Sequence, residues 1–428
     1  MHRSRWFFRA LFVSVCSLTF SSPARAGGLD ALLARAAEVD PTLAGAAAEA
    51  DVSAAKVGQA RAALLPRLTA SAGYTRNEVA SEVEIPGEDT VVITPLDQLD
   101  ATLRLDVPLL DLAAWSSLAA AADCRDAATA EATAKRQSAL LAVAQAAWDL
   151  RTATLARDAA AAAVAANERV LARVDARRSV GTGAAVDLLR ATADLAQSRG
   201  ALAEADADLA AARRALSART GVDVLPSDLT PRARPDGDLE AGARARPEVE
   251  AARAQLACRT RTVTGNQLGV APTIAGFAQE RASNATGFAG QATQWSAGAT
   301  ISWSALEGGR RAAEVAEAAA SRRLAEANLR LREQEARDGL ADGRARLDAA
   351  ALSLAAARVR RDAADAAAAD ARSRFESGTG GAADVSVALR DALDATVDLA
   401  RAEARHAVAV EALRVAAGQS LLLDGGAR

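Results

Sequence analysis

The sequence predicts a mainly α-helical protein with a small β part, organised as two tandem structural repeats of long antiparallel helical hairpins. Alanine, the residue with the highest helix propensity, dominates two stretches at about 111–178 and 307–376. Only 3% of the 428 residues are aromatic, too few for an ordinary globular core, and 50% are hydrophobic, too many for a disordered chain. A Gly-Thr-Gly sequence also occurs twice, at 181–183 and 378–380.

The N-terminus has the pattern of a secretory signal peptide over residues 1–26. Three arginines precede an apolar run at 10–20, and Ala24-Arg25-Ala26 forms a small-residue cleavage site. A membrane anchor is the alternative, but this run is too short to span a bilayer as a helix. The cysteine of this segment follows a valine and not the small residue of a lipid-attachment site, so a lipoprotein is rejected.

Charge and composition after residue 26 exclude several classes of function. This part has 47 basic against 54 acidic residues, a net charge of −7, whereas nucleic-acid binding needs a clustered basic surface. Its one histidine, His406, excludes His-rich metal sites and His-based triads. P-loop, dinucleotide-binding and Cys-x-x-Cys motifs do not occur. The sequence therefore predicts no enzyme and no bound cofactor, metal or nucleic acid.

Two cysteines follow the signal segment, and their state stays open at this point. Cys124 and Cys258 each lie in an Ala- and Arg-rich helical stretch. They are able to pair in an oxidising compartment. Two small buried residues without a covalent link are at least as compatible with the sequence.

Glycine and proline residues at constant offsets define the two repeats. The first repeat covers 27–221, a Pro-rich linker covers 222–238, the second repeat covers 239–418, and a tail covers 419–428. The matched pairs are Gly181 with Gly378, Gly221 with Gly418, Pro41 with Pro247, and Pro66 with Pro272.

Each repeat is predicted to contain the same elements in the same order. A helical run at 29–63, or 240–268, ends before a proline, which lacks the backbone donor. Two strands, a long helix of about 100 Å, a Gly-Thr-Gly turn and a returning helix follow. The segment 77–98 is expected to be a solvated acidic loop. The predicted strands are 67–77, 98–108, 273–281 and 294–304, and the predicted helical hairpins are 111–221 and 307–418.

The predicted strands alternate apolar or small residues with polar ones. This pattern is typical of membrane β-barrels and also of ordinary half-buried strands. Aromatic residues favour the membrane, because Trp and Tyr concentrate at the membrane–water interface. Four strands cannot close a barrel and a bilayer does not tolerate open edges, so several chains are expected to share one, and three chains give twelve strands. The expected interface aromatics are Tyr74, Phe277, Trp295 and Trp303.

The order and duplication of these motifs resemble the TolC-type outer-membrane efflux protein family of Gram-negative bacteria. The similar features are the signal segment, Asp40-Pro41, Leu64-Leu65-Pro66, Val107-Pro108-Leu109 and the duplicated Gly-x5-Asp turn. The resemblance implies a homotrimer with a twelve-stranded barrel in outer-membrane lipid and a helical barrel in the periplasm. It also implies partners: a periplasmic adaptor (membrane fusion) protein and an inner-membrane transporter.

The resemblance places the gate and the adaptor-docking tips at the two hairpin turns. Asp384 matches an acidic position at the constriction of the family, whereas Val387 departs from a second acidic position. For Asp187 and Asp384, the alternative role is charge complementarity to a helix N-terminus. The tip residues are Val180, Gly181, Thr182, Gly183, Asp187, Ser377, Gly378, Thr379, Gly380, Asp384 and Val387.

The function expected from the sequence is a passive exit duct of a tripartite efflux or type I secretion system, with an iris-like periplasmic gate. The alternative is a periplasmic coiled-coil adaptor or structural protein without a membrane barrel. An adaptor is expected to carry a single helical hairpin, so the duplication favours the duct. The sequence leaves the class of cargo and the class of pump open.

Overall fold

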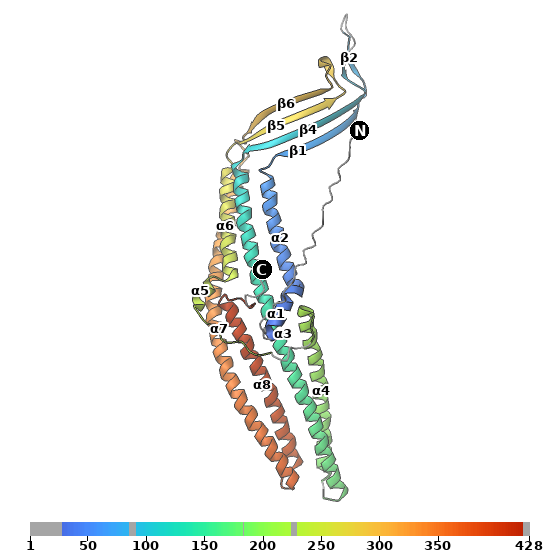
Figure 1. The fold of residues 1–428 in the computed structure, drawn as a ribbon, viewed down its shortest axis with the longest axis vertical. Coiled ribbons are helices and arrows are strands. Elements are labelled where there is room, and N and C mark those ends of the chain that lie inside the picture. The colour runs from blue at the N-terminus through green and yellow to red at the C-terminus, as the bar shows by residue number, and fades with distance from the viewer. Residues whose placement is uncertain (1–27, 85–90, 183, 224–228, 423–428) are drawn as a thin grey trace, which may run out of the picture.

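The computed structural model describes residues 28–84, 91–182, 184–223 and 229–422. The expected signal peptide, residue 183, part of the linker and the end of the tail lie outside these residues. The molecule is elongated, with a β-sheet at one end and long helices that extend from it (Figure 1). The prediction of a mainly helical chain with a small sheet is confirmed.

Prolines divide each expected leading helix into two. Where one run at 29–63 was expected, the structure has α1 (Gly28–Val39) and α2 (Pro41–Ala62). The buried Asp40 carboxylate accepts a hydrogen bond from the Thr42 N–H at 2.8 Å and caps α2, with Pro41 in its first turn. The run at 240–268 is likewise α5 (Leu239–Arg244) and α6 (Pro247–Leu268). A proline in the first turn, with a side-chain cap only in α2, therefore outweighs the continuous apolar pattern.

The main sheet has four antiparallel strands in the order β1-β4-β5-β6. The β1–β4 and β5–β6 pairs lie within the two halves of the chain, and β4–β5 joins the halves. The strands are β1 (Arg67–Arg76), β4 (Asp97–Leu110), β5 (Thr273–Ser283) and β6 (Thr293–Ser302).

The segment expected to be an acidic loop contains a second, two-stranded hairpin. Its strands are β2 (Ser81–Val83) and β3 (Val91–Thr94), and they extend beyond the main sheet (Figure 1). The expectation of a plain loop is wrong because Val83, Val91 and Val92 are β-branched residues that favour a pleated strand. The 3-10 helix η1 (Gly287–Ala289) lies in the connection between β5 and β6.

Four long helices form two antiparallel hairpins. They are α3 (Leu112–Ser179), α4 (Ala185–Thr220), α7 (Arg310–Ser377) and α8 (Ala382–Ala416). Helices α3 and α7 each have 68 residues and reach about 100 Å. Many of their buried positions are alanines, which allow close helix–helix approach. Buried alanines include Ala120, Ala127, Ala134, Ala147, Ala318, Ala325 and Ala336.

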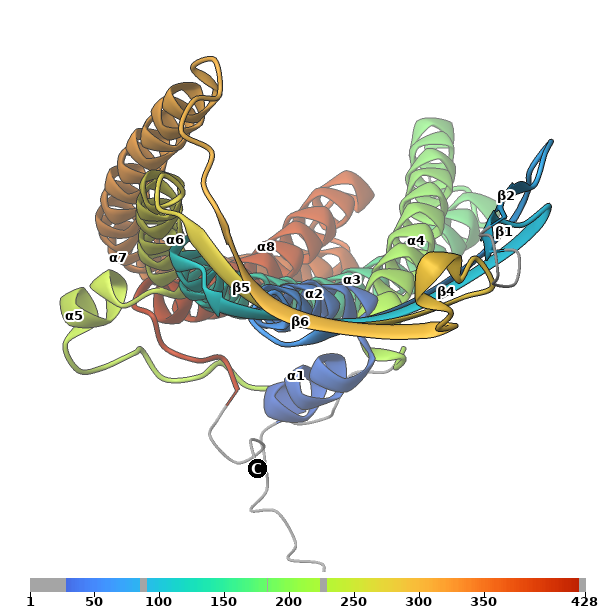
Figure 2. The same ribbon diagram turned by 90° about the horizontal axis from the view of Figure 1, so that it is seen from above.

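The helices form a curved wall whose neighbours change along its length. Nearest the sheet the order is α2, α3, α6, α7, and at the far end it is α4, α3, α8, α7. Seen from above, α1 and α5 lie on the convex side of this wall (Figure 2). Helix α7 therefore forms one edge over the whole length, and α2 and α4 form the other.

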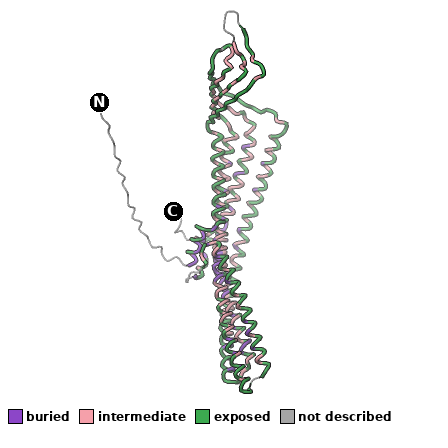
Figure 3. The backbone as a smooth tube through the Cα atoms, turned by 90° about the vertical axis from the view of Figure 1, so that its right-hand side faces the viewer, coloured by how far each residue is buried: buried purple, intermediate pink, exposed green. Residues whose placement is uncertain are grey.

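The largest apolar core lies at mid-height, where α1, the linker and the C-terminal segment cross the helices (Figure 3). Leu33, Leu140, Trp148, Leu216 and Leu421 are almost completely buried in it. Leu229 of the linker and Leu421 of the C-terminal segment pack in this core together with α1, α3, α4 and α8. We call this crossing region, residues 28–39 with 229–244 and 417–422, the belt.

Candidate functional site: a two-faced sheet and two hairpin tips

One face of the main sheet is apolar and exposed. Leu68, Leu105 and Ala278 lie side by side on β1, β4 and β5, and Leu103, two residues from Leu105, lies on the same face. The exposed fraction is 65% for Leu68 and 47% for Leu103. Small residues cover much of the rest of this face, and the exposed Glu280, which pairs with Leu103 and Trp295, is a charged exception in its middle. A row of exposed leucines and alanines is a surface suited to apolar surroundings.

The opposite face is polar, and its charges are paired. The Arg104 guanidinium lies 2.9 Å from the Asp106 carboxylate, and Arg281 lies 2.7 Å from Asp100 across the β4–β5 pair. Arg104 also donates to Gln279 at 3.2 Å. The face therefore presents charges of both signs, already hydrogen-bonded to each other.

The four expected interface aromatics do not all share one face. Tyr74 and Trp295 lie on the apolar face, with exposed fractions of 61% and 82%, and the Tyr74 hydroxyl donates to Asp97 at 2.7 Å. Trp303 lies just after β6 and is also exposed, and its indole N–H donates to the Val270 carbonyl at 3.0 Å.

Phe277 does not share this face. It pairs with Asp106 and therefore lies on the polar face. The Arg104 guanidinium lies 4.9 Å from the centre of the Phe277 ring, and a Cβ atom at position 298 would lie only 3.2 Å from that ring. The period-two pattern predicted which residues share a face with Phe277 but not that this face is the polar one.

The first hairpin tip closes with a left-handed glycine. Gly181 has φ of 79°, a conformation that residues with a side chain rarely adopt. Val180 ends α3 with 72% of its side chain exposed. Thr182 donates from both its N–H and its hydroxyl to the Arg177 carbonyl, each at 3.0 Å. Gly183 lies outside the described residues.

The second tip is built in the same way, with Gly378 at φ of 83°. The Arg374 carbonyl accepts from the N–H groups of Thr379 at 2.9 Å and Gly380 at 3.0 Å, and from the Ser377 hydroxyl at 3.0 Å. Asp384 is exposed, and its carboxylate accepts from the Gly381 N–H at 3.2 Å. Asp384 therefore caps α8, which is the alternative role expected from the sequence.

A small apolar core joins the two hairpins just above the tips. Phe375 of α7 and Val385 of α8 pack against Val170 and Val174 of α3 and Ala191 of α4. The Arg177 guanidinium lies 4.6 Å from the centre of the Phe375 ring and donates to the Phe375 carbonyl at 2.9 Å. Sequence reasoning did not identify Phe375, although it is the one aromatic residue after Trp303.

Two hollows separate α4 from α8. A cavity of about 230 Å³ near the tips brings Asp187 and Val387 together with Arg190, Asp194 and Arg390. Asp384 does not line it. Above it, α3, α4, α7 and α8 enclose a cavity of about 980 Å³. Burial raises the pKa of Asp149, which lines this larger cavity, above its ordinary value.

Neither a metal site nor a helical membrane span is found among the described residues. Histidine, cysteine, aspartate and glutamate side chains do not gather there in groups of three or more that could hold a metal ion. The helices in the described part of the chain are not both long and apolar enough to cross a membrane.

The sequence profile of the outer membrane efflux proteins matches residues 32–222 and 241–419. The chain belongs to the outer membrane efflux protein family. It is 31% identical to the outer membrane protein TolC of Vibrio cholerae over 178 residues, which are 42% of this chain and 38% of that protein. The match thus spans well under half the length of that relative. The sequence-based resemblance to TolC-type proteins is confirmed.

Solved structures share the fold over nearly the whole chain. A membrane protein from Pseudomonas aeruginosa superposes with a TM-score of 0.78 at 22% identity, covering 92% of this chain and 94% of that one. The CmeC outer membrane channel of Campylobacter jejuni gives 0.79 at 15% identity, covering 97% and 94%. Membership locates the chain in the outer membrane of a Gram-negative bacterium, extending into the periplasm. The family consists of efflux channels and is not an enzyme family.

Proposed function

We propose that this protein is the passive exit duct of a tripartite efflux or type I secretion system, working as a homotrimer with a gate at its hairpin tips. The observation that carries the proposal is the four-stranded sheet. One of its faces is exposed and apolar, and its outer strands β1 and β6 have free edges within the described residues. Both features suit a sheet that continues into neighbouring copies inside a bilayer.

The order of the helices supports ring closure by repetition of one contact. Within the chain, α3 packs on α6 and β4 pairs with β5. In the two proposed repeats, α7 corresponds to α3 and α2 to α6. The same contact made between copies would set α7 on the α2 of the next copy and β6 on its β1. Three copies then give a closed barrel of twelve strands, without a free edge.

An exposed apolar stripe on α7 supports this contact. Leu324, Leu331, Leu352 and Val359 are spaced by multiples of seven residues, with exposed fractions between 51% and 74%. Heptad spacing keeps side chains on one seam of a helix that winds around a partner. Helix α7 also forms an edge of the wall, so this stripe is positioned to meet a second copy.

The proposed gate lies at the tips, where a periplasmic adaptor docks and an inner-membrane transporter supplies the energy. The Phe375 core holds the two hairpins together directly above the tips. Over the next turns a cavity separates α4 from α8, and the hairpins meet through α3 and α8 and through the Arg390–Asp194 ion pair at 3.7 Å. Separation of the hairpins at the tips would therefore break few apolar contacts and would widen the passage.

Conductance of the purified protein in planar lipid bilayers tests the duct. We expect discrete channel openings from the wild type, and an Asp384→Ala variant with lower preference for cations. Asp370→Ala is the matched control, because Asp370 is an exposed carboxylate on the same hairpin paired with Arg374 at 2.8 Å. Protein that fractionates as soluble periplasmic material without detergent would refute the duct. Unchanged selectivity in Asp384→Ala would remove Asp384 from the pore lining.

A further inference from the structure

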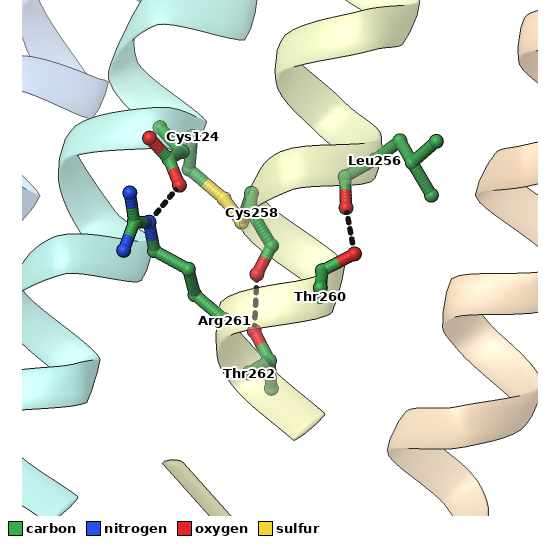
Figure 4. The surroundings of a disulfide bond; sticks show 7 residues. Cys124, Leu256, Cys258, Thr260, Arg261 and Thr262 are labelled. Atoms are coloured by element: carbon green, nitrogen blue, oxygen red, sulfur yellow. Dashed lines mark hydrogen bonds and ion pairs between the residues drawn. A yellow bond between two sulfur atoms is a disulfide. The ribbon is translucent and has the colours of Figure 1, made fainter. Parts of the chain in front are cut away.

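We infer that the Cys124–Cys258 disulfide fixes the register of the β4–β5 strand pair. The two cysteines are bonded and join α3 to α6, with their Cα atoms 5.2 Å apart (Figure 4). Helix α3 begins two residues after β4 ends, and α6 ends shortly before β5 begins. The bond therefore links the two helices that continue directly from the two central strands.

The β4–β5 pair is the one pairing of the main sheet that no short connection specifies. The β5–β6 hairpin turns within 284–292, and β1 and β4 are joined by the β2–β3 segment. By contrast, Asp100 pairs with Ser283, which is 183 positions away along the chain. Turn geometry sets register in hairpins, so this central pair needs another determinant. Its side chains supply the Arg281–Asp100 and Arg104–Gln279 contacts, but alanine and glycine take four of the eleven positions of β5 and add little apolar packing.

The β4–β5 strand pair continues into the α3–α6 helix pair with the same antiparallel alignment. Leu105 pairs with Ala278 in the sheet, and Ser116 faces Gly265 below it. The Ser116 hydroxyl donates to the Arg261 carbonyl at 3.0 Å, and Arg261 pairs with Asp123 at 2.5 Å, beside the disulfide. Asp111 caps α3 directly after β4 by accepting from the Ala114 N–H at 2.8 Å. A slip of β4 along β5 would therefore move α3 along α6.

The face pattern of the sheet excludes slips by an odd number of residues. A one-residue slip would place side chains such as Arg104 and Asp106 opposite the apolar positions of β5. A two-residue slip preserves the pattern. It would break the Arg281–Asp100 and Ser116–Arg261 contacts, and the disulfide is the covalent link that excludes it. Such a slip is a shift of about 6.6 Å along the strand. It would lengthen the Cα separation of the two cysteines to about 8.4 Å, beyond the roughly 6.8 Å that a disulfide permits.

The bond requires an oxidant, which the periplasm contains. Formation removes two protons and two electrons from the two thiols, and a disulfide-bonded oxidoreductase accepts the electrons by thiol–disulfide exchange. A chain oxidised before it enters the membrane would carry its two half-sheets already aligned. The inference concerns the folding of one chain and does not depend on the proposed gate or cargo.

The test compares the wild type with the Cys124→Ser/Cys258→Ser variant, each refolded into phosphatidylethanolamine and phosphatidylglycerol vesicles. Solid-state NMR contacts between Leu103 and Glu280, which are direct cross-strand partners, report the register. Heat-modifiable mobility on gels reports assembly. If the register and the two slips by two residues become equally populated, the native contacts and the assembled fraction both fall to about one third of the wild-type values.

Two relocated disulfides in the cysteine-free chain separate register from general stabilisation. Ser116→Cys/Gly265→Cys joins α3 to α6 at positions whose Cβ atoms lie about 3.3 Å apart, near the disulfide range. Gly343→Cys/Ala416→Cys joins α7 to α8 at 3.8 Å and leaves β4 and β5 unlinked. We expect rescue by the first pair and not by the second. Equal rescue by both pairs, or native register and yield without any disulfide, would overturn the inference.

Discussion

Replacement of Arg232 by methionine should lower the free energy of unfolding more than the loss of an exposed ion pair would. The Arg232 guanidinium is 13% exposed and donates to Glu411 at 3.1 Å and to the Leu421 carbonyl at 3.0 Å, and it also pairs with Asp30. One side chain of the linker thus joins α1, α8 and the C-terminal segment.

The magnitude follows from the burial of Glu411, whose side chain is 1% exposed. Removing one partner of a buried ion pair costs about 3–5 kcal/mol, because the remaining charge is neither hydrated nor paired. Arg414 remains 3.7 Å from the Glu411 carboxylate as an ion pair without a hydrogen bond, so it compensates in part and the loss should be about 3 kcal/mol, the lower end of this range. Asp30 is 18% exposed and is more easily hydrated than Glu411, so losing its pair with Arg232 adds less to the destabilisation.

Urea unfolding in detergent, followed by the helical circular dichroism signal, measures the loss. Arg234→Met is the matched control, because Arg234 lies two residues away and pairs with Asp348 at 3.2 Å on the exposed surface. Such a pair contributes about 0–1 kcal/mol. The double variant Arg232→Met/Glu411→Met should recover part of the loss, since it removes the most deeply buried charge, Glu411, while Asp30 and Arg414 each lose an ion-pair partner. Equal effects of Arg232→Met and Arg234→Met would refute the reasoning.

Three further variants test other parts of the molecule. Phe375→Ala should lower the free energy of unfolding by about 3–5 kcal/mol and raise the conductance of the resting channel in planar bilayers; unchanged conductance contradicts a gate held by this core. Leu352→Glu should convert the oligomer to monomer, measured by light scattering in detergent, and a stable oligomer would exclude the α7 stripe from the interface. Burial raises the pKa of Glu411, so the folded state binds its proton more tightly than the unfolded state does. The free energy of unfolding of the wild type should therefore rise relative to that of Glu411→Gln as the pH falls through the raised pKa towards 4.5. A decrease in this difference would contradict the raised pKa.

Local residue patterns predicted the helices, strands and turns. Features that depend on contacts between distant parts of the chain could not be predicted. The turns at Gly181 and Gly378 could be predicted because their left-handed backbone requires glycine. The period of two predicted the strands, but the side on which Phe277 lies depends on pairing with β4. The Cys124–Cys258 bond stayed open because an alanine-rich helix does not reveal which helix lies beside it.

The residues that sequence reasoning missed have partners far away along the chain. Arg232 meets Glu411 and Asp30, which are 179 and 202 positions away. Phe375 packs against Val170 and Val174 of the other hairpin. No local pattern encodes such contacts. Arginine is common on protein surfaces, and a single phenylalanine in a helix is also common, so neither residue type is a signal by itself. The one signal in the sequence was that Phe375 is an isolated aromatic residue three positions before the glycine turn at Gly378.

The links between the two halves of the chain are unequally distributed along its length. At the sheet end, the halves are joined by the β4–β5 ladder and by the disulfide, and at mid-height by the apolar core and Arg232 of the belt. Below the belt the halves meet where α3 packs on α8, cavities separate α4 from α8, and the Phe375 core is the last apolar link before the tips. Since a fold moves where the fewest interactions break, relative motion of the hairpins should be concentrated at the tips. This unequal distribution supports a gate at the tips from the contacts of the chain itself, independently of any relative.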